Sequence, residues 1–140
     1  MLANAPVQTV LDTQAITTLL YRSLRYADEK RTDELPHCYA DIVTIDFGGV
    51  KPSQQISAKD LAAWAGRAYA LVKTQHMMFN VGVEVNGDNA TSRSCGHALH
   101  ERTDHERLLA YLPTLRERVR PYGRRLANRS HPYDADFRAR

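Results

Sequence analysis

Cysteines, targeting features and long apolar runs are scarce or missing in this 140-residue chain. Its two cysteines, Cys38 and Cys95, are far apart and form no Cys-x-x-Cys pair, so neither a zinc ribbon nor a redox motif is supported. The first residues lack a basic segment followed by an apolar run, and no window approaches the ~18 apolar residues of a membrane span. We therefore expect a cytoplasmic protein without a membrane partner.

Common catalytic and metal-binding motifs are also missing. The chain has no Gly-x-Ser-x-Gly elbow, no phosphate-binding glycine loop and no His-Glu-x-x-His. The segment "HALHERTDH" is rich in potential ligands, but His97 and His100 are three positions apart, which on a strand places them on opposite faces. We therefore expect no metal site, and Cys95 among small residues is a poor candidate for a nucleophile.

The formal charge of +3 is distributed unevenly along the chain. The first hundred residues are nearly balanced, whereas arginines concentrate after position 101. Such a basic segment could make the chain a nucleic-acid-binding adaptor, or it could be the solvated face of a strand. No recognised nucleic-acid motif accompanies the charge, so we expect no nucleic-acid partner.

Hydrophobic residues make up 43% of the chain, which is enough for one packed domain. We expect a flexible lead over residues 1–12, a domain over 13–133 and a disordered tail over 134–140. A first helix, capped by Asp12 or Thr13, should end near Lys30. Apolar residues at helical spacing predict it: Ile16, Leu19, Leu20, Leu24 and Ala27.

Two further helices are predicted. A short one should begin at Thr32, with Leu35, Cys38 and Tyr39 facing inward. A longer one should begin at Ser57, with Asp60 as its capping-box acid. The expected buried stripe of the longer helix is Leu61, Trp64, Ala65, Ala68, Leu71 and Val72.

The remaining pattern is that of strands. The segments "IVTIDFGG", "FNVGVEV" and "ATSRSCGHALH" alternate with period two, and "NGDN" predicts a hairpin between the last two. We read the last forty residues as one or two strands up to Arg120, with a break at Pro113, and a closing strand over 124–130. The predicted fold is therefore α+β, a curved antiparallel sheet wrapped around about three helices. The even positions of the returning strand are all small: Ala90, Ser92, Ser94, Gly96 and Ala98.

Asp28 and His76 are the most promising pair for chemistry. Asp28 follows Leu24 by one helical turn and Leu20 by two, so it lies on or beside the buried stripe. A buried carboxylate needs a hydrogen-bond donor, and His76 in "VKTQHMMFNV" is a suitable one. An Asp–His pair in an apolar site makes a general base.

Simpler interpretations of both residues remain open. Asp28 could pair with Arg25 or Lys30 in water, and His76 could be a core histidine. Strict alternation also places His76 opposite Phe79 and the valines that follow, so a β-bulge, or a strand start near Met77, has to turn the imidazole inward.

The order of these elements resembles the SnoaL-like branch of the nuclear-transport-factor-2-like superfamily, which includes scytalone dehydratase, bile-acid 7α-dehydratase and hexachlorocyclohexane dehydrochlorinase. The first helix of that branch ends in an Asp with an apolar residue seven positions later, as Asp28 and Leu35 are in "ADEKRTDEL". The branch also has a histidine and an Asn at the start of the strand after the long helix, as His76 and Asn80 are in "HMMFN". The hairpin "VEVNGDNATSRS" is similar too.

This resemblance implies a cone-shaped fold, a cystatin-like α+β barrel, and a lyase or isomerase that needs no cofactor. His76 would be the general base and Asp28 its partner, acting on a small, mostly apolar cyclic or polyketide-like substrate. His100, with His97 as the alternative, matches the second histidine of scytalone dehydratase, and Arg120 matches the arginine of the dehydrochlorinase. The expected substrate pocket is lined by Leu24, Phe47, Trp64, Met78 and Asn80.

Two tyrosines of scytalone dehydratase correspond here to Ala27 and Phe47, and Tyr26 is the substitute that we consider. The resemblance also implies a homodimer or higher homo-oligomer. The alternative function is a non-catalytic small-molecule-binding or dimerisation domain on the same fold.

Overall fold

The computed structural model describes residues 7–47, 52–87, 89–102, 108–111, 114–121 and 133–139. Among these residues no helix combines the length and the apolar character needed to cross a lipid bilayer. The elements, in chain order, are α1 (Val7–Asp28), the 3₁₀ helix η1 (Leu35–Cys38), β1 (Ile42–Phe47), β2 (Gln54–Ser57), α2 (Ala58–Ala68), β3 (Val72–Asn86), β4 (Asn89–Arg102), β5 (Leu108–Tyr111), β6 (Thr114–Pro121) and β7 (Tyr133–Ala139).

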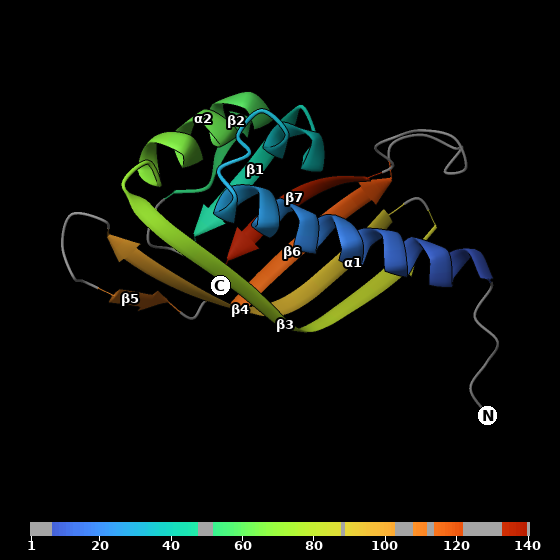
Figure 1. Cartoon of the computed structure of the whole chain (residues 1–140). Helices are drawn as coiled ribbons and strands as arrows, with labels where there is room; N and C mark the ends of the chain where they lie inside the picture. Colours follow the sequence, from blue (N-terminus) through green and yellow to red (C-terminus); the bar gives the residue numbers. More distant parts are fainter. Residues whose placement is uncertain are drawn as a thin grey trace.

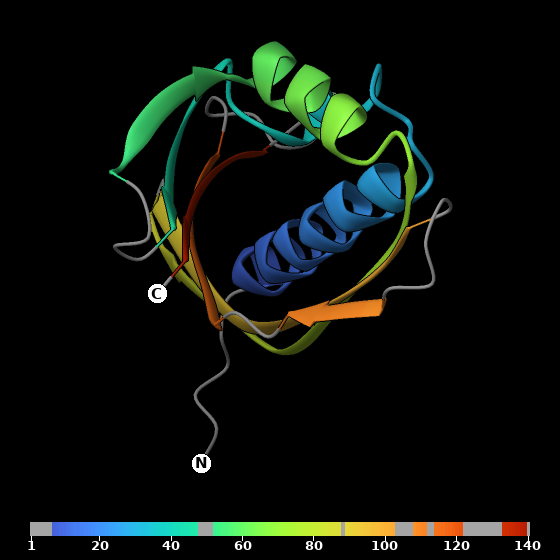
Figure 2. The same ribbon diagram turned by 90° about the vertical axis from the view of Figure 1, so that its left-hand side faces the viewer.

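The strands form one curved sheet in the order β2-β1-β7-β6-β4-β3, with β5 also paired to β4. Among the described strands every pairing is antiparallel except that of β1 with β7, which is parallel. α1 lies on the concave side of the sheet (Figure 1), and α2, which connects the edge strands β2 and β3, covers the open side (Figure 2). The predicted α+β cone is confirmed, with the parallel pair as the one departure from an antiparallel sheet.

α1 begins earlier than the sequence predicts. Val7–Asp12, expected in a flexible lead capped at Asp12 or Thr13, are already helical. No glycine or proline interrupts residues 7–28, so nothing stops the helix from extending toward the N-terminus. Its predicted apolar face is buried at Ile16, Leu19 and Leu20.

α1 lies against β3, and the small-residue face of β4 forms the wall of the cone next to β3. The predicted small face of β4 is buried at every position from Ala90 to Ala98. Because these side chains are short, the core beside them is filled mainly by side chains of α1 and β3. The core cluster then joins Ile16 and Leu20 of α1 to Cys38, Met78 and Ala90.

The N-terminus of α2 agrees with the prediction, but of the predicted buried stripe only Ala65 is buried. Ser57 is the N-cap, its hydroxyl accepting from the Asp60 N–H at 3.0 Å and donating to the Asp60 carboxylate at 2.6 Å. The buried residues are Ala58, Ala62 and Ala65, and the last two form a second cluster with Leu35 of η1. The helix is therefore rotated so that alanines make its close contacts and Trp64 is left 47% exposed. Leu71, which lies beyond the end of the helix, is 60% exposed.

The C-terminal part of the chain also departs from the prediction. The strand β7, Tyr133–Ala139, lies between β1 and β6 and includes residues 134–139 of the predicted disordered tail. Backbone hydrogen bonds to the strands on both sides hold this segment as a strand, although its own sequence does not predict one. The closing strand expected over 124–130 lies outside the described residues. η1 has Glu34, not Thr32, at its N-cap.

A β-bulge in β3 turns His76 inward. Phe79 pairs with Cys95 and Gly82 with Arg93, so Asn80 and Val81 lie opposite the single residue between them. Before the bulge Thr74, His76 and Met78 face the core, and after it the inward residues are Val81, Val83 and Val85. A bulge was one of the two predicted ways to orient His76, and it occurs after Phe79, not near Met77.

Asn80 has the left-handed φ of 52° that this bulge requires. Asn tolerates that conformation, whereas a β-branched residue placed there would be destabilised by about 1–2 kcal/mol. We therefore expect Asn80→Val to lower the free energy of unfolding by that amount, whereas Asn80→Gly should be close to neutral. Urea denaturation of both variants measures the difference, and equal stabilities would show that the bulge does not constrain this position.

Candidate active site

Asp28 is the last residue of α1 and faces β3. The helix ends because Lys30 adopts a left-handed φ of 59°, and two hydrogen bonds close the turn, from the Lys30 N–H to the Ala27 carbonyl and from the Arg31 N–H to the Tyr26 carbonyl. This is the Schellman arrangement of a helix C-terminus. The turn directs the chain away and leaves the Asp28 carboxylate against the start of β3.

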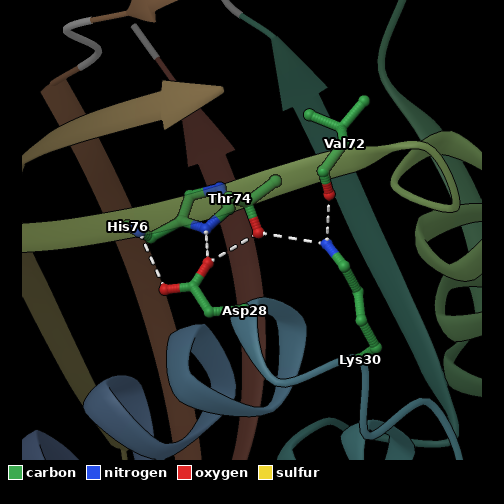
Figure 3. Close-up of polar contacts among 5 residues, drawn as sticks. All are labelled: Asp28, Lys30, Val72, Thr74 and His76. Carbon is green, nitrogen blue, oxygen red and sulfur yellow. Dashed lines mark hydrogen bonds and ion pairs between the residues drawn. The ribbon is translucent and has the colours of Figure 1, made fainter. Parts of the chain in front are cut away.

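The carboxylate receives three hydrogen bonds from β3 (Figure 3). The Thr74 hydroxyl donates to Oδ1 at 2.8 Å, the His76 backbone N–H donates to Oδ2 at 2.9 Å, and the Nδ1 atom of His76 lies 2.6 Å from Oδ1. The side chains of His76 and Asp28 are 17% and 21% exposed. The predicted contact between the two residues is therefore present.

The hydrogen bonds determine the tautomer of His76. An ionised carboxylate can only accept, so Nδ1 must carry the proton that fills the 2.6 Å contact. In the neutral imidazole the other ring nitrogen, Nε2, then has a lone pair. This arrangement can take a proton from a carbon or oxygen acid while Asp28 stabilises the imidazolium that forms.

Two more rings complete the site. The ring centroids of Tyr69, His76 and His100 are 5.4–5.9 Å apart. His100 is paired with Thr74 across the β3–β4 ladder, on the inner face, whereas His97 is paired with Met77 on the opposite face. Among the two histidines considered from the sequence, His100 is therefore the one that lies beside His76.

The surroundings of His100 and Tyr69 disfavour the charged form of each side chain, the imidazolium and the phenolate. Burial, followed by the neighbouring His76, lowers the pKa of His100 below its ordinary value. The Nε2 atom of His100 is buried and has no partner among the described residues. Burial, followed by the Asp28 charge, raises the pKa of Tyr69. Near neutral pH both groups are therefore uncharged and able to form hydrogen bonds with a ligand.

Tyr69 was missed in the sequence, where Tyr26 was the tyrosine considered. Tyr26 instead packs beneath Arg31, whose guanidinium carbon lies 4.3 Å from the ring centroid. The available signal was helical spacing, because Tyr69 follows the buried Ala65 by one turn and so lies on the inner side of the C-terminus of α2.

The residues expected to line a pocket are distributed unevenly. Met78 is buried and Leu24 packs against the same core cluster, close to the inner face of β3. Trp64 is half exposed, although it meets Tyr69 edge-to-face at 6.3 Å, and Asn80 is exposed at the bulge. Neither has the burial expected of a pocket-lining side chain. The side chains of Phe47 and of Arg120, in β6, lie outside those that the structure describes.

No group of three or more His, Cys, Asp or Glu side chains that could hold a metal ion occurs within the described ranges. Cys38 is buried, and burial raises the pKa of its thiol to about 11, so it stays protonated and unreactive.

An α+β cone with an Asp–His pair on its inner face defines a class of small domain, and a comparison of the sequence identifies the family. A family model for the SnoaL-like domain matches residues 8–123. The chain therefore belongs to the SnoaL-like family. No curated protein matches it at a significant level.

Solved structures share the fold at low sequence identity. A protein from Kribbella flavida has a TM-score of 0.79 at 20% identity, with 94% of this chain and 92% of that chain covered. An NTF2-like protein with a cystatin-like fold from Novosphingobium aromaticivorans has a TM-score of 0.74 at 17% identity, with 95% and 83% covered. A candidate scytalone dehydratase from the same organism has a TM-score of 0.72 at 13% identity, with 94% and 86% covered.

The lowered pKa of His100 predicts how stability depends on pH. As the pH falls below about 6.5, the histidine of the unfolded chain binds a proton before the folded one does, so the free energy of unfolding decreases. We expect His100→Gln to remove this contribution and flatten the decrease between pH 7.5 and pH 5.5, measured by urea denaturation. The exposed His37→Gln serves as the control, and equal slopes in wild type and His100→Gln would contradict the prediction.

Proposed function

We propose that the chain is a cofactor-independent lyase or isomerase in which His76 is the general base. The observation that carries this proposal is the 2.6 Å contact between Nδ1 of His76 and Asp28, between side chains that are mostly removed from solvent. Membership of the SnoaL-like family supports it, as does the likeness to a candidate scytalone dehydratase.

The reaction begins with a carbon acid. His76 Nε2 removes a proton from a carbon next to a carbonyl, and the C–H electron pair moves to form a C=C bond. In an elimination, the bond from the neighbouring carbon to its hydroxyl or halide breaks, and the leaving group departs with that bond's electrons. A hydroxyl takes the proton back from the imidazolium and leaves as water, whereas after loss of a halide ion the imidazolium gives its proton to solvent. In an isomerisation, the proton returns to a different carbon. In both cases the imidazolium lies against the Asp28 carboxylate, which lowers the energy of the charged intermediate.

Tyr69 and His100 are suited to bind the substrate's oxygen. Both lie within 6 Å of the His76 ring, centroid to centroid, and both are neutral hydrogen-bonding groups near pH 7. Met78 and Leu24 supply apolar surface nearby. This combination suits a neutral, mostly apolar cyclic or polyketide-like molecule with a carbonyl and a hydroxyl or halide.

Loss of the general base should greatly slow proton abstraction from the substrate. In D₂O, the wild type should catalyse deuterium exchange, or elimination, in at least one member of a panel of cyclic ketones and β-hydroxyketones, followed by mass spectrometry. We expect His76→Ala and Asp28→Asn to reduce that rate by ~100-fold or more, the range for a lost general base. His97→Ala, on the same sheet but on its opposite face, is the matched control and should retain the wild-type rate.

A rate that survives in His76→Ala and Asp28→Asn would refute the proposed roles. Binding of panel members without exchange in any variant would instead favour a non-catalytic small-molecule-binding domain, because that function needs a site but no base.

A further inference from the structure

Lys30 has an unusual place in the chain. It occupies the left-handed position that ends α1, with a φ of 59°. This position is usually glycine, because any other residue brings its Cβ too close to the backbone. A strained residue that persists suggests that its side chain contributes something.

The side chain of Lys30 reaches the start of β3 (Figure 3). Its ammonium donates to the Val72 carbonyl at 2.7 Å and to the Thr74 hydroxyl oxygen at 3.4 Å, and it lies 5.2 Å from the centroid of the Tyr69 ring. Lys30 therefore connects the end of α1, the first residues of β3 and the ring cluster of the site.

These contacts determine where the Thr74 proton points. An ammonium has only donors, so the Thr74 oxygen accepts from Lys30 and its own hydrogen is directed elsewhere. The Asp28 Oδ1 atom, at 2.8 Å, is the acceptor that it meets. The resulting chain runs in one direction, from Lys30 to Thr74 to Asp28, and Oδ1 also meets Nδ1 of His76.

We propose that Lys30 and Thr74 are positioning residues for the Asp28–His76 pair. Together they hold the carboxylate in the orientation that keeps the proton on Nδ1 and the lone pair on Nε2 of His76. The inference deepens the proposed function and rests on it for its effect on turnover, but the effect on the His76 tautomer can be measured without a substrate. Neither residue is required to touch the reacting molecule.

The groups that face His76 come from every element around it. Asp28 contacts the imidazole from α1, Tyr69 from the residue that caps α2 and His100 from β4, while Lys30, in the turn after α1, lies over the Tyr69 ring. Of these, only Asp28 has hydrogen bonds to His76 among the described contacts. A change at Lys30 or Thr74 should therefore reach the imidazole mainly through Asp28.

The decisive variants are Thr74→Val, which keeps the shape and removes the hydroxyl, and Thr74→Ser, which restores it. We expect ¹⁵N NMR of the imidazole to show His76 as the Nδ1–H tautomer in wild type and Thr74→Ser, and a mixture of tautomers in Thr74→Val. On a panel substrate, kcat of Thr74→Val should fall about ten- to a hundredfold, as for the loss of one hydrogen bond to a charged group. KM should stay unchanged, and the loss should disappear in an Asp28→Asn background.

Lys30→Gly separates the backbone from the side chain, because glycine suits the left-handed position and the variant should fold. We expect it to share the tautomer mixture and the lower kcat of Thr74→Val. If Lys30→Gly and Thr74→Val keep the wild-type tautomer, the positioning inference is wrong, whatever the activity. If the tautomer changes but no variant, His76→Ala included, alters deuterium exchange, the positioning inference stands and the proposed function fails.

Discussion

The carboxylate of Asp28 is the point at which the helix and the sheet of this protein are joined. It ends α1 and receives three hydrogen bonds, all from residues of β3. A mostly buried carboxylate is costly unless its oxygens are satisfied, so the end of α1 must lie at the first residues of β3 and nowhere else along the strand. The same bonds give His76 its tautomer. The constraint that places the helix is therefore also the one that prepares the base.

Two features of the β3–β4 hairpin make this join feasible. The buried face of β4, from Ala90 to Ala98, is made of small residues, so side chains of α1 and β3 can fill the interior beside it. The bulge at Asn80 then changes which side of β3 faces the core. Without it, His76 and Val83 could not both face inward, because a strand with strict alternation presents only positions of the same parity. The bulge thus reconciles an apolar core at one end of β3 with a polar site at the other.

Much of this was predictable from the sequence, and the exceptions share a cause. Helical periodicity predicted the buried face of α1, turn residues predicted the hairpin, and a capping box predicted the N-cap at Ser57. Each of these signals depends on neighbours within a few positions. The family resemblance pointed to Asp28 and His76. The rotation of α2 toward its alanines, the strand Tyr133–Ala139 and the position of the bulge depend on partners distant in sequence. Helical spacing places Tyr69 on the inner side of α2, but the contacts of its ring with the two histidines depend on strands that lie further along the chain.

The charges of the site limit what it can bind. Among the described residues around His76, the charged groups are Asp28 and Lys30, and each is already occupied by partners within the protein. Tyr69 and His100 offer hydrogen bonds without charge, since burial disfavours ionisation of both. A charged ligand would have to leave water without gaining an ion pair, which is unfavourable. A neutral molecule loses little solvation free energy when it enters the site, and it becomes charged only when His76 takes a proton from it. The site is therefore better matched to the transition state of a proton transfer than to an ionic ligand at rest.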